Sequence, residues 1–542
     1  MFESYKRFAP SLAIGLGVCC VLLGLIFVCL TLLLLEAKGE ASVFAIDAKL
    51  IRTLAFTSVQ AGLSTLASLA MALPLSWALS HQRKFLGRRL LVALLSVAMV
   101  LPALVAVLGL VTVWGRRGWF NDLLTTMELG STGSWIYGIG GILLAHCFLN
   151  APFMARSLLQ RFEAIPTEQR KLSRSLDLSA WQRFRFMEWP AIKGSLPALC
   201  STVFLLCFTS FAIVLTLGGS PKYNTLEVAI YEAIKLDFDI RRAVILALTQ
   251  LAVCAVLVSI ASSFRITSKS VSEQNYVSPW PETGTKLTLQ IALIGLFAVF
   301  FLAPLAAIVV NGTSKDLWKV LQDPLFHRTA FNSLALATAS ALLTLLMAIT
   351  LIKARVNTIA PERMPQTKLT LLLRQVLSFS GSLYLAVPSL VMAFGFFLLA
   401  RQLFSSIYFV APVALILANA LLALPFAMAV LGPAIEKTAS KHDRLAFTLR
   451  IKGWSRWRLL EWPLIRQEVA FVSALAFCFS LGDFGIISLF GSQDFATLPW
   501  LLYQKMGSYR TDEAAAIALI LLIITLTVFL AVPTMRRGKS HA

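Results

Sequence analysis

The sequence predicts an all-α polytopic membrane protein, with twelve transmembrane helices arranged as two fused six-helix copies. The first observation is composition: 58% of the 542 residues are hydrophobic and 14% are charged, an apolar share above that of soluble domains. The second is length, because twelve apolar stretches are each long enough to cross a bilayer as a helix. The third is a motif that recurs in two basic loops. Together these observations exclude water as the main solvent of the chain.

Each predicted span is an apolar run whose backbone a helix can satisfy internally within the hydrocarbon core. Strands of a β-barrel would be shorter and would alternate in polarity. The first run follows Lys6 and Arg7, but it is about 25 residues long and lacks an A-x-A site, which favours a retained helix over a cleaved leader. The predicted spans cover residues 11–35, 54–79, 90–114, 135–155, 195–218, 243–264, 287–310, 333–352, 376–400, 407–431, 469–490 and 514–532.

The basic residues predict how the chain is oriented. With the N-terminus in the cytoplasm, the cytoplasmic segments hold 33 of the 48 Lys and Arg residues and the external loops hold 15. The positive-inside rule then predicts a multi-pass inner-membrane protein with both termini in the cytoplasm. This topology also explains the formal net charge of +21, because basic residues lie against membrane lipid at the inner leaflet. A nucleic-acid partner is therefore not expected.

The sequence shows no metal, redox or nucleotide site. The eight cysteines lie in apolar stretches without a C-x-x-C pair, and the five histidines lack metal-ligand spacing. The fragment nearest to a P-loop, Gly538-Lys539-Ser540, has Pro533 where the first glycine should stand. No nucleophile or carboxylate pair forms a catalytic group. We therefore expect a chain that is not an enzyme and that holds no metal or cofactor.

The strongest internal signal is a repeated ten-residue motif. Trp181 to Pro190 reads WQRFRFMEWP, and Trp454 to Pro463 reads WSRWRLLEWP, with an offset of 273 positions. Each motif lies in a basic loop that precedes the fifth span of its half. The recurrence predicts two copies of one six-helix unit in the same orientation, related by a pseudo-two-fold axis along the membrane normal.

The residues of this motif predict a short amphipathic helix outside the bilayer, which the proline is expected to break before the next span. The alternative is a solvated basic loop against the inner leaflet. Repetition at equivalent positions favours docking to a symmetric partner. The candidate docking residues are Trp181, Arg183, Arg185, Glu188, Pro190, Trp454, Arg456, Arg458, Glu461 and Pro463.

Asp483 is the only charged residue that falls within a predicted span. An ionisable group at membrane depth is costly and usually faces a cavity or a partner. Gly482 and Gly485 beside it permit bending or close packing, so these three residues are the candidates for a solute pathway that favours a cation. The alternative is a structural carboxylate satisfied by helix-end amides near a kink. Its counterpart in the first copy lies near Ser210, which is uncharged.

The two basic loops resemble the EAA loop of type I ABC importer permeases, which ends in Leu-Pro. The resemblance implies that each loop forms a coupling helix seated in a cleft of a nucleotide-binding subunit, so that the ten docking residues couple the chain to an ATPase. Aligned on Pro190 and Pro463, Asp177 and Arg450 stand where this family has glycine.

A narrower resemblance covers nearly the whole chain. The segments LGGSPKYNTL from Leu217, SLGDFG from Ser480 and LPWLLYQKMG from Leu498 resemble the thiamine importer permeases. This implies a permease subunit that imports thiamine and its phosphates by alternating access. It also implies two partners: a homodimeric cytoplasmic ABC ATPase, which binds the ATP, and a periplasmic thiamine-binding protein.

The resemblance divides the chain into two type I transmembrane domains with connecting segments. These are an N-terminal helix and first periplasmic loop (1–52), the first domain (53–264), a cytoplasmic linker (265–286), helix seven with a periplasmic loop (287–330), the second domain (331–533) and a cytoplasmic tail (534–542).

Two alternative functions remain open. Permeases for ferric iron have a similar fused layout. Ion-coupled secondary transporters of the major facilitator class also have twelve spans in a six-plus-six repeat, but they emphasise the loop between spans two and three. This chain carries only the cluster Gly87-Arg88-Arg89 in that loop, which favours the ATP-driven class.

Overall fold

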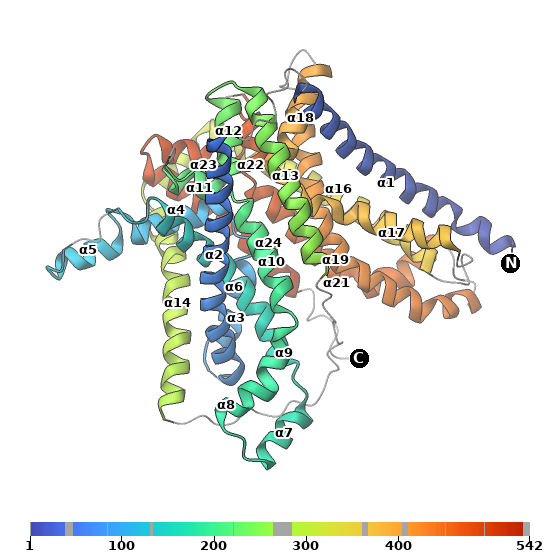
Figure 1. Ribbon diagram of the computed structural model, residues 1–542, viewed down its shortest axis with the longest axis horizontal. Helices are drawn as coiled ribbons and strands as arrows, with labels where there is room; N and C mark the ends of the chain where they lie inside the picture. Colours follow the sequence, from blue (N-terminus) through green and yellow to red (C-terminus); the bar gives the residue numbers. More distant parts are fainter. Residues whose placement is uncertain are drawn as a thin grey trace.

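The chain folds as a bundle of helices. Within the described residues every regular element is a helix. Eleven of these helices are long and apolar enough to cross a membrane, or twelve when the bent pair 180–193 and 196–208 counts as one span. The all-α, polytopic prediction is therefore confirmed. The computed structural model (Figure 1) describes residues 2–37, 47–83, 85–130, 134–219, 222–263, 284–359, 367–403, 410–449, 451, 453–492 and 494–534.

Most of the predicted linker (265–286) and tail (534–542) lies outside the described residues. The first copy precedes the linker and the second follows it. The elements of the first copy are α1 (Phe2–Ala37), α2 (Ala48–His81), α3 (Arg88–Val97), α4 (Ala103–Trp114), α5 (Trp119–Thr126), α6 (Ile139–Glu163), α7 (Thr167–Ser175), α8 (Ala180–Arg183), η2 (Phe184–Glu188), α9 (Trp189–Lys193), α10 (Leu196–Phe208), α11 (Ala212–Leu217), α12 (Leu226–Lys235) and α13 (Ile240–Ser263).

The second copy has a similar order of elements, and the helices before and after its repeated motif are longer than those of the first copy. Its elements are α14 (Thr285–Gly312), α15 (Asp316–Gln322), α16 (Pro324–Ile359), α17 (Lys368–Ser382), η3 (Leu383–Ala386), α18 (Ser389–Leu403), α19 (Ala411–Thr448), α20 (Gly453–Arg456), η4 (Trp457–Glu461), α21 (Trp462–Gly482), α22 (Gly485–Phe490), α23 (Leu498–Gly507) and α24 (Thr511–Thr534).

The first helix of each copy packs against the other copy. In Figure 1, α1 lies beside α16 and α17, whereas α14 lies on the opposite side of the molecule beside α2. Equivalent glycines permit the close approach, because small residues let membrane helices pack tightly. A Cβ on Gly109 of α4 would lie 2.7 Å from the Pro304 carbonyl oxygen in α14, and one on Gly395 of α18 would lie 2.9 Å from the Cβ of Cys29 in α1. The two copies are thus interlocked.

Four of the predicted spans are broken rather than continuous. Spans three and nine break before α4 and α18, at Pro102 and Pro388, where a proline without an N–H group is tolerated at a helix start. Spans five and eleven break between α10 and α11 and between α21 and α22. Non-helical backbone at membrane depth is tolerated only where protein or a cavity surrounds it. The four breaks therefore mark a region where surrounding parts of the protein must supply hydrogen-bond partners for the exposed backbone groups.

Figure 1 shows where this region lies. The short helices α11, α12, α22 and α23, which follow the breaks in spans five and eleven, gather at the top of the view, whereas α7, α8 and α9 lie at the bottom. The helix breaks and the first of the two repeated basic motifs therefore lie at opposite ends of the view. The helix breaks and the two motifs are the candidate sites.

Candidate functional site

The first elbow, formed by α8, η2 and α9, is a short helix that includes one π-helical turn. The Ser179 hydroxyl accepts a hydrogen bond from the Gln182 backbone N–H, and the Gln182 side chain accepts from the Ser179 N–H, so a capping box begins the helix.

The expectation that Pro190 breaks the helix is wrong. Pro190 lies inside the continuous helical run 180–193, two residues after the π turn ends at Glu188. The altered hydrogen-bond pattern of a π turn accommodates the missing N–H group of a proline, and a 54° bend follows only after Lys193.

The second elbow, formed by α20 and η4, has the same π-helical turn but continues without a comparable bend. Pro463 lies two residues after the π turn ends at Glu461, and α20, η4 and α21 follow one another without a gap from Gly453 to Gly482. The expected break at Pro463 is wrong for the same reason as at Pro190. Both π turns end at the Trp-Pro pair, and π turns within α-helices are frequent at functional positions.

The exposure pattern of the two elbows is the same at equivalent positions. Trp181 is 68% exposed and Trp454 is 74% exposed. Arg185 and Arg458 are exposed, whereas Arg183 and Arg456 are half-buried. The structure thus brings the predicted docking residues of each copy onto one short segment, with a large aromatic ring projecting from its start.

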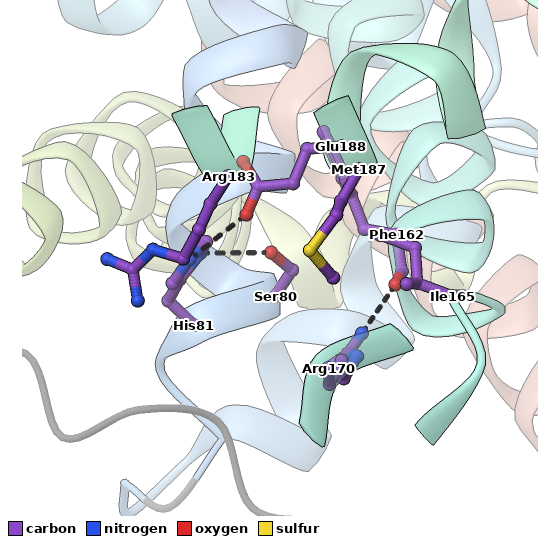
Figure 2. Close-up of a pocket in the computed structure, with 8 residues that line it drawn as sticks. All are labelled: Ser80, His81, Phe162, Ile165, Arg170, Arg183, Met187 and Glu188. Atoms are coloured by element: carbon purple, nitrogen blue, oxygen red, sulfur yellow. Dashed lines mark hydrogen bonds and ion pairs between the residues drawn. The ribbon is translucent and has the colours of Figure 1, made fainter. Parts of the chain in front are cut away.

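Each elbow glutamate joins its elbow to the second membrane-spanning helix of the same copy, α2 or α16. Glu188 Oε1 lies 3.2 Å from His81 Nε2 at the end of α2, and Figure 2 shows this pair lining a small cavity with Met187 and Arg170. Glu461 Oε2 lies 3.1 Å from Lys353 Nζ of α16. The elbow and the bundle are therefore connected by an ionisable pair in both copies.

The second elbow has more contacts at this joint than the first. Glu461 Oε1 accepts a hydrogen bond of 2.8 Å from Arg456 Nε, and the Lys353 ammonium lies 4.0 Å from the ring centroid of Trp457. This geometry suits a cation–π interaction. The Lys353 side chain is therefore held from two sides.

The position where the resembling family has glycine adopts a left-handed backbone in the first copy. Asp177, just after α7, has φ of 46°, a conformation that asparagine and aspartate tolerate better than most residues. A glycine would adopt this left-handed backbone conformation without strain. Arg450, the equivalent residue of the second copy, lies outside the described residues.

The candidate pathway residues lie at the break between α21 and α22. Asp483 Oδ2 accepts a hydrogen bond of 3.2 Å from the Ile486 N–H, so a helix-end amide holds one carboxylate oxygen. A Cβ on Gly482 would lie 3.2 Å from Pro102 of the first copy, and one on Gly485 would lie 3.0 Å from Ser389 Oγ. The two glycines thus allow the breaks of spans three, nine and eleven to meet.

Sequence reasoning missed an aromatic row at the same break. Phe211 and Phe484 stack with centroids 5.7 Å apart and planes 17° apart. Tyr231 flanks Phe211 at 5.3 Å, and Tyr503 flanks Phe484 at 4.8 Å. Phe211 and Phe484 are separated by the same 273 positions as the elbow motifs, and this offset is the signal that could have found them.

Asp483, which is half-buried, is not the only carboxylate held within the bundle, as the sequence had suggested. Glu227, assigned to an external loop, is fully buried in α12. Gln250 Nε2 of α13 donates a 3.0 Å hydrogen bond to Glu227 Oε1, and Oε2 has no hydrogen-bond partner among the described residues. The apolar residues around Glu227 in LEVAIYEAI were the available signal.

No group of three or more His, Cys, Asp or Glu side chains in the described part of the chain has a geometry that could hold a metal ion. The contacts described above show that the site at the helix breaks consists of aromatic rings, two carboxylates and close backbone contacts. Such a site can bind and orient a small solute.

Comparison with known proteins identifies the repeat unit. The model of the family described as "Binding-protein-dependent transport system inner membrane component" matches residues 67–269 and 368–534, which places one match in each copy. The sulfate transport system permease protein CysT of Escherichia coli (strain K12) is 25% identical over 247 residues, covering 44% of this chain and 86% of the relative. One copy is thus about as long as that permease.

Closer relatives span nearly the whole chain. The thiamine transport system permease protein ThiP of Brucella abortus (strain 2308) is 39% identical over 520 residues, covering 94% of this chain and 92% of the relative. ThiP of Escherichia coli (strain K12) is 38% identical over 486 residues, covering 89% and 88%. No solved structure gives a significant match.

Proposed function

Because the chain belongs to the family of binding-protein-dependent transport system inner membrane components, we propose that it is the permease subunit of an ATP-driven importer for thiamine. The family membership makes it a multi-pass inner-membrane permease. The substrate follows from the relatives named for thiamine transport, which are similar over about nine tenths of this chain. We include thiamine phosphates, since they share the aromatic cation.

The observation that carries the proposal is the pair of elbows with matching exposed faces. Large aromatic and arginine side chains are enriched where proteins bind one another, and each elbow presents both at the same positions. Two equivalent surfaces suit two identical subunits. The partner is therefore a homodimeric cytoplasmic ABC ATPase, which binds and hydrolyses the ATP, while this chain is not an enzyme.

The ionisable pairs at the elbows support a mechanism of alternating access. Movement of an elbow by the ATPase is passed to α2 through Glu188 and His81 and to α16 through Glu461 and Lys353. Rigid helices convert this displacement into tilting of the two halves. A periplasmic thiamine-binding protein delivers the solute at the end where α11, α12, α22 and α23 gather.

The mechanism requires the elbows and both termini to be in the cytoplasm, as the distribution of basic residues predicts. A cysteine introduced at position 181 or 454, in a variant without the eight native cysteines, tests the orientation. We expect a membrane-impermeant thiol reagent to label either position only after the inner membrane is opened. Labelling of intact spheroplasts would place the elbows in the periplasm and contradict the proposal.

Transport is tested in vesicles that hold the permease, its ATPase and the thiamine-binding protein. We expect radiolabelled thiamine to accumulate with ATP and to stop when a non-hydrolysable analogue replaces it. Vesicles with the permease alone are the control. Accumulation driven by an ion gradient without ATP would instead assign the chain to the secondary transporters.

A further inference from the structure

The aromatic row lies on the axis that relates the two copies. Phe211 and Phe484 are equivalent residues, and equivalent residues can touch each other only where the axis passes between them. Both rings are nearly fully buried. The Phe211–Phe484 stack therefore lies at the interface between the two halves of the molecule.

Two carboxylates accompany this stack, the half-buried Asp483 and the fully buried Glu227. Asp483 directly precedes Phe484, and Glu227 lies one helical turn before Tyr231 on the same face of α12. A buried carboxylate is unfavourable without a compensating cation, and Glu227 Oε2 has no hydrogen-bond partner in the described residues. The contacts of Glu227 and Asp483 among these residues are with an amide side chain and a backbone N–H, and neither carboxylate forms an ion pair there.

We infer that Phe211 and Phe484 form an axial gate, which opens to take a flat aromatic cation between its two rings while Asp483 and Glu227 balance the positive charge. Tyr231 and Tyr503 support the two rings from outside. This inference rests on the proposed function and adds to it the residues that recognise the solute.

The stacked state explains why an aromatic solute opens this gate at low cost. Separating the two rings loses one aromatic contact, but a flat ring inserted between them forms two. A positive charge on that ring adds attraction to the ring faces and to the carboxylates. A solute without a flat cationic ring does not restore both interactions, so the gate selects for solutes that carry an aromatic cation.

The complete transporter in proteoliposomes tests the gate, with thiamine as the probe and thiamine moved per ATP hydrolysed as the readout. The double variant Phe211→Leu/Phe484→Leu is expected to lower this ratio about tenfold, because both ring contacts are lost. ATP hydrolysis itself should persist, since the elbows are unchanged. Phe211→Tyr/Phe484→Tyr retains both rings and is expected to stay within about threefold of the wild type.

The matched control is Phe297→Leu. Phe297 stacks on Phe301 within α14, with centroids 6.0 Å apart, but both rings belong to the same helix. Its transport ratio should equal that of the wild type. A wild-type ratio in the double leucine variant, or an equal loss in the leucine and tyrosine variants, would overturn the gate. Absence of thiamine uptake by the wild-type complex would refute the proposed function instead.

The carboxylates are tested separately. Glu227→Gln keeps the size of the side chain but removes its charge, and we expect about a tenfold lower transport ratio, equivalent to the loss of one favourable charge interaction. Asp237→Asn, on an exposed residue just beyond α12, should have no effect. An unchanged ratio for Glu227→Gln would remove Glu227 from the recognition of the cation.

Discussion

The two elbows present the same surface but are attached to the bundle differently. Trp181 and Trp454 project to a similar extent, and both elbows contain a π turn before Trp-Pro. The first is tied to α2 by a histidine, which carries a charge only when protonated. The second is tied to α16 by a lysine, with an added arginine contact.

The shape of the attachment differs as well. A 54° bend separates the first elbow from the next span, whereas the second elbow runs on into α21. The proposed docking of both elbows to two identical subunits accounts for the surface that the copies share. Under the same proposal, the connection behind that surface differs because those subunits do not contact it. Substitutions at equivalent positions of the two elbows can distinguish the role of the exposed surface from that of the attachment to the bundle.

The largest effect is expected for the exposed tryptophans. Trp181→Ala and Trp454→Ala each remove a ring of the kind that costs about 2 kcal/mol or more when truncated in an interface, about 30-fold in affinity. Because the rings are similarly exposed, we expect similar losses of ATPase binding, measured by titrating the purified permease with the ATPase. The double variant should fail to co-purify with it.

Trp318→Ala is the control for both tryptophan variants. Trp318 is 72% exposed but lies on α15, far along the chain from either elbow, and its removal should leave the affinity unchanged. A loss confined to one of the two elbows would show that only one copy docks to the ATPase.

A smaller effect is expected where the copies differ at the helix breaks. Asp483→Asn removes the charge at the second break and should lower thiamine uptake about tenfold, if one charge contact is lost. Ser210→Ala changes the equivalent residue of the first copy and should leave uptake nearly unchanged. Size-exclusion chromatography of the full complex should show normal assembly for both variants. Normal uptake kinetics for Asp483→Asn would remove this residue from the transport mechanism.

The smallest effect is expected for the elbow glutamates. Glu461→Gln weakens contacts with both Lys353 and Arg456, and we expect a loss of about 1 kcal/mol in the free energy of unfolding, compared with about 0.5 kcal/mol for Glu188→Gln, whose ion pair in the described residues is with His81 alone. Thermal unfolding in detergent should show the larger decrease in Tm for Glu461→Gln. Glu168→Gln, exposed on α7, should not shift Tm. Equal shifts for the two elbows would mean that the Arg456 contact adds no stability.

The sequence alone predicted the class of the fold, the number of spans and the positions of the elbows. These features depend on local composition and on a repeat, which can be read from neighbouring residues. The family resemblance was also correct, because it rests on segments such as SLGDFG from Ser480 that are contiguous in the chain.

Only the tertiary structure decided which distant residues meet. The crossing of α1 and α14, the stack of Phe211 on Phe484 and the pairing of Glu188 with His81 join positions that are far apart in the sequence. The burial of Glu227 was missed because the short helix α12 folds back into the bundle, and a helix of 10 residues is too short to predict as a span. The effect of the elbow prolines was misjudged because a π turn lies just before each Trp-Pro pair, and its altered hydrogen-bond pattern accommodates a proline inside the helix. Local chemistry thus determines what each segment can form, whereas burial and contact depend on packing between segments.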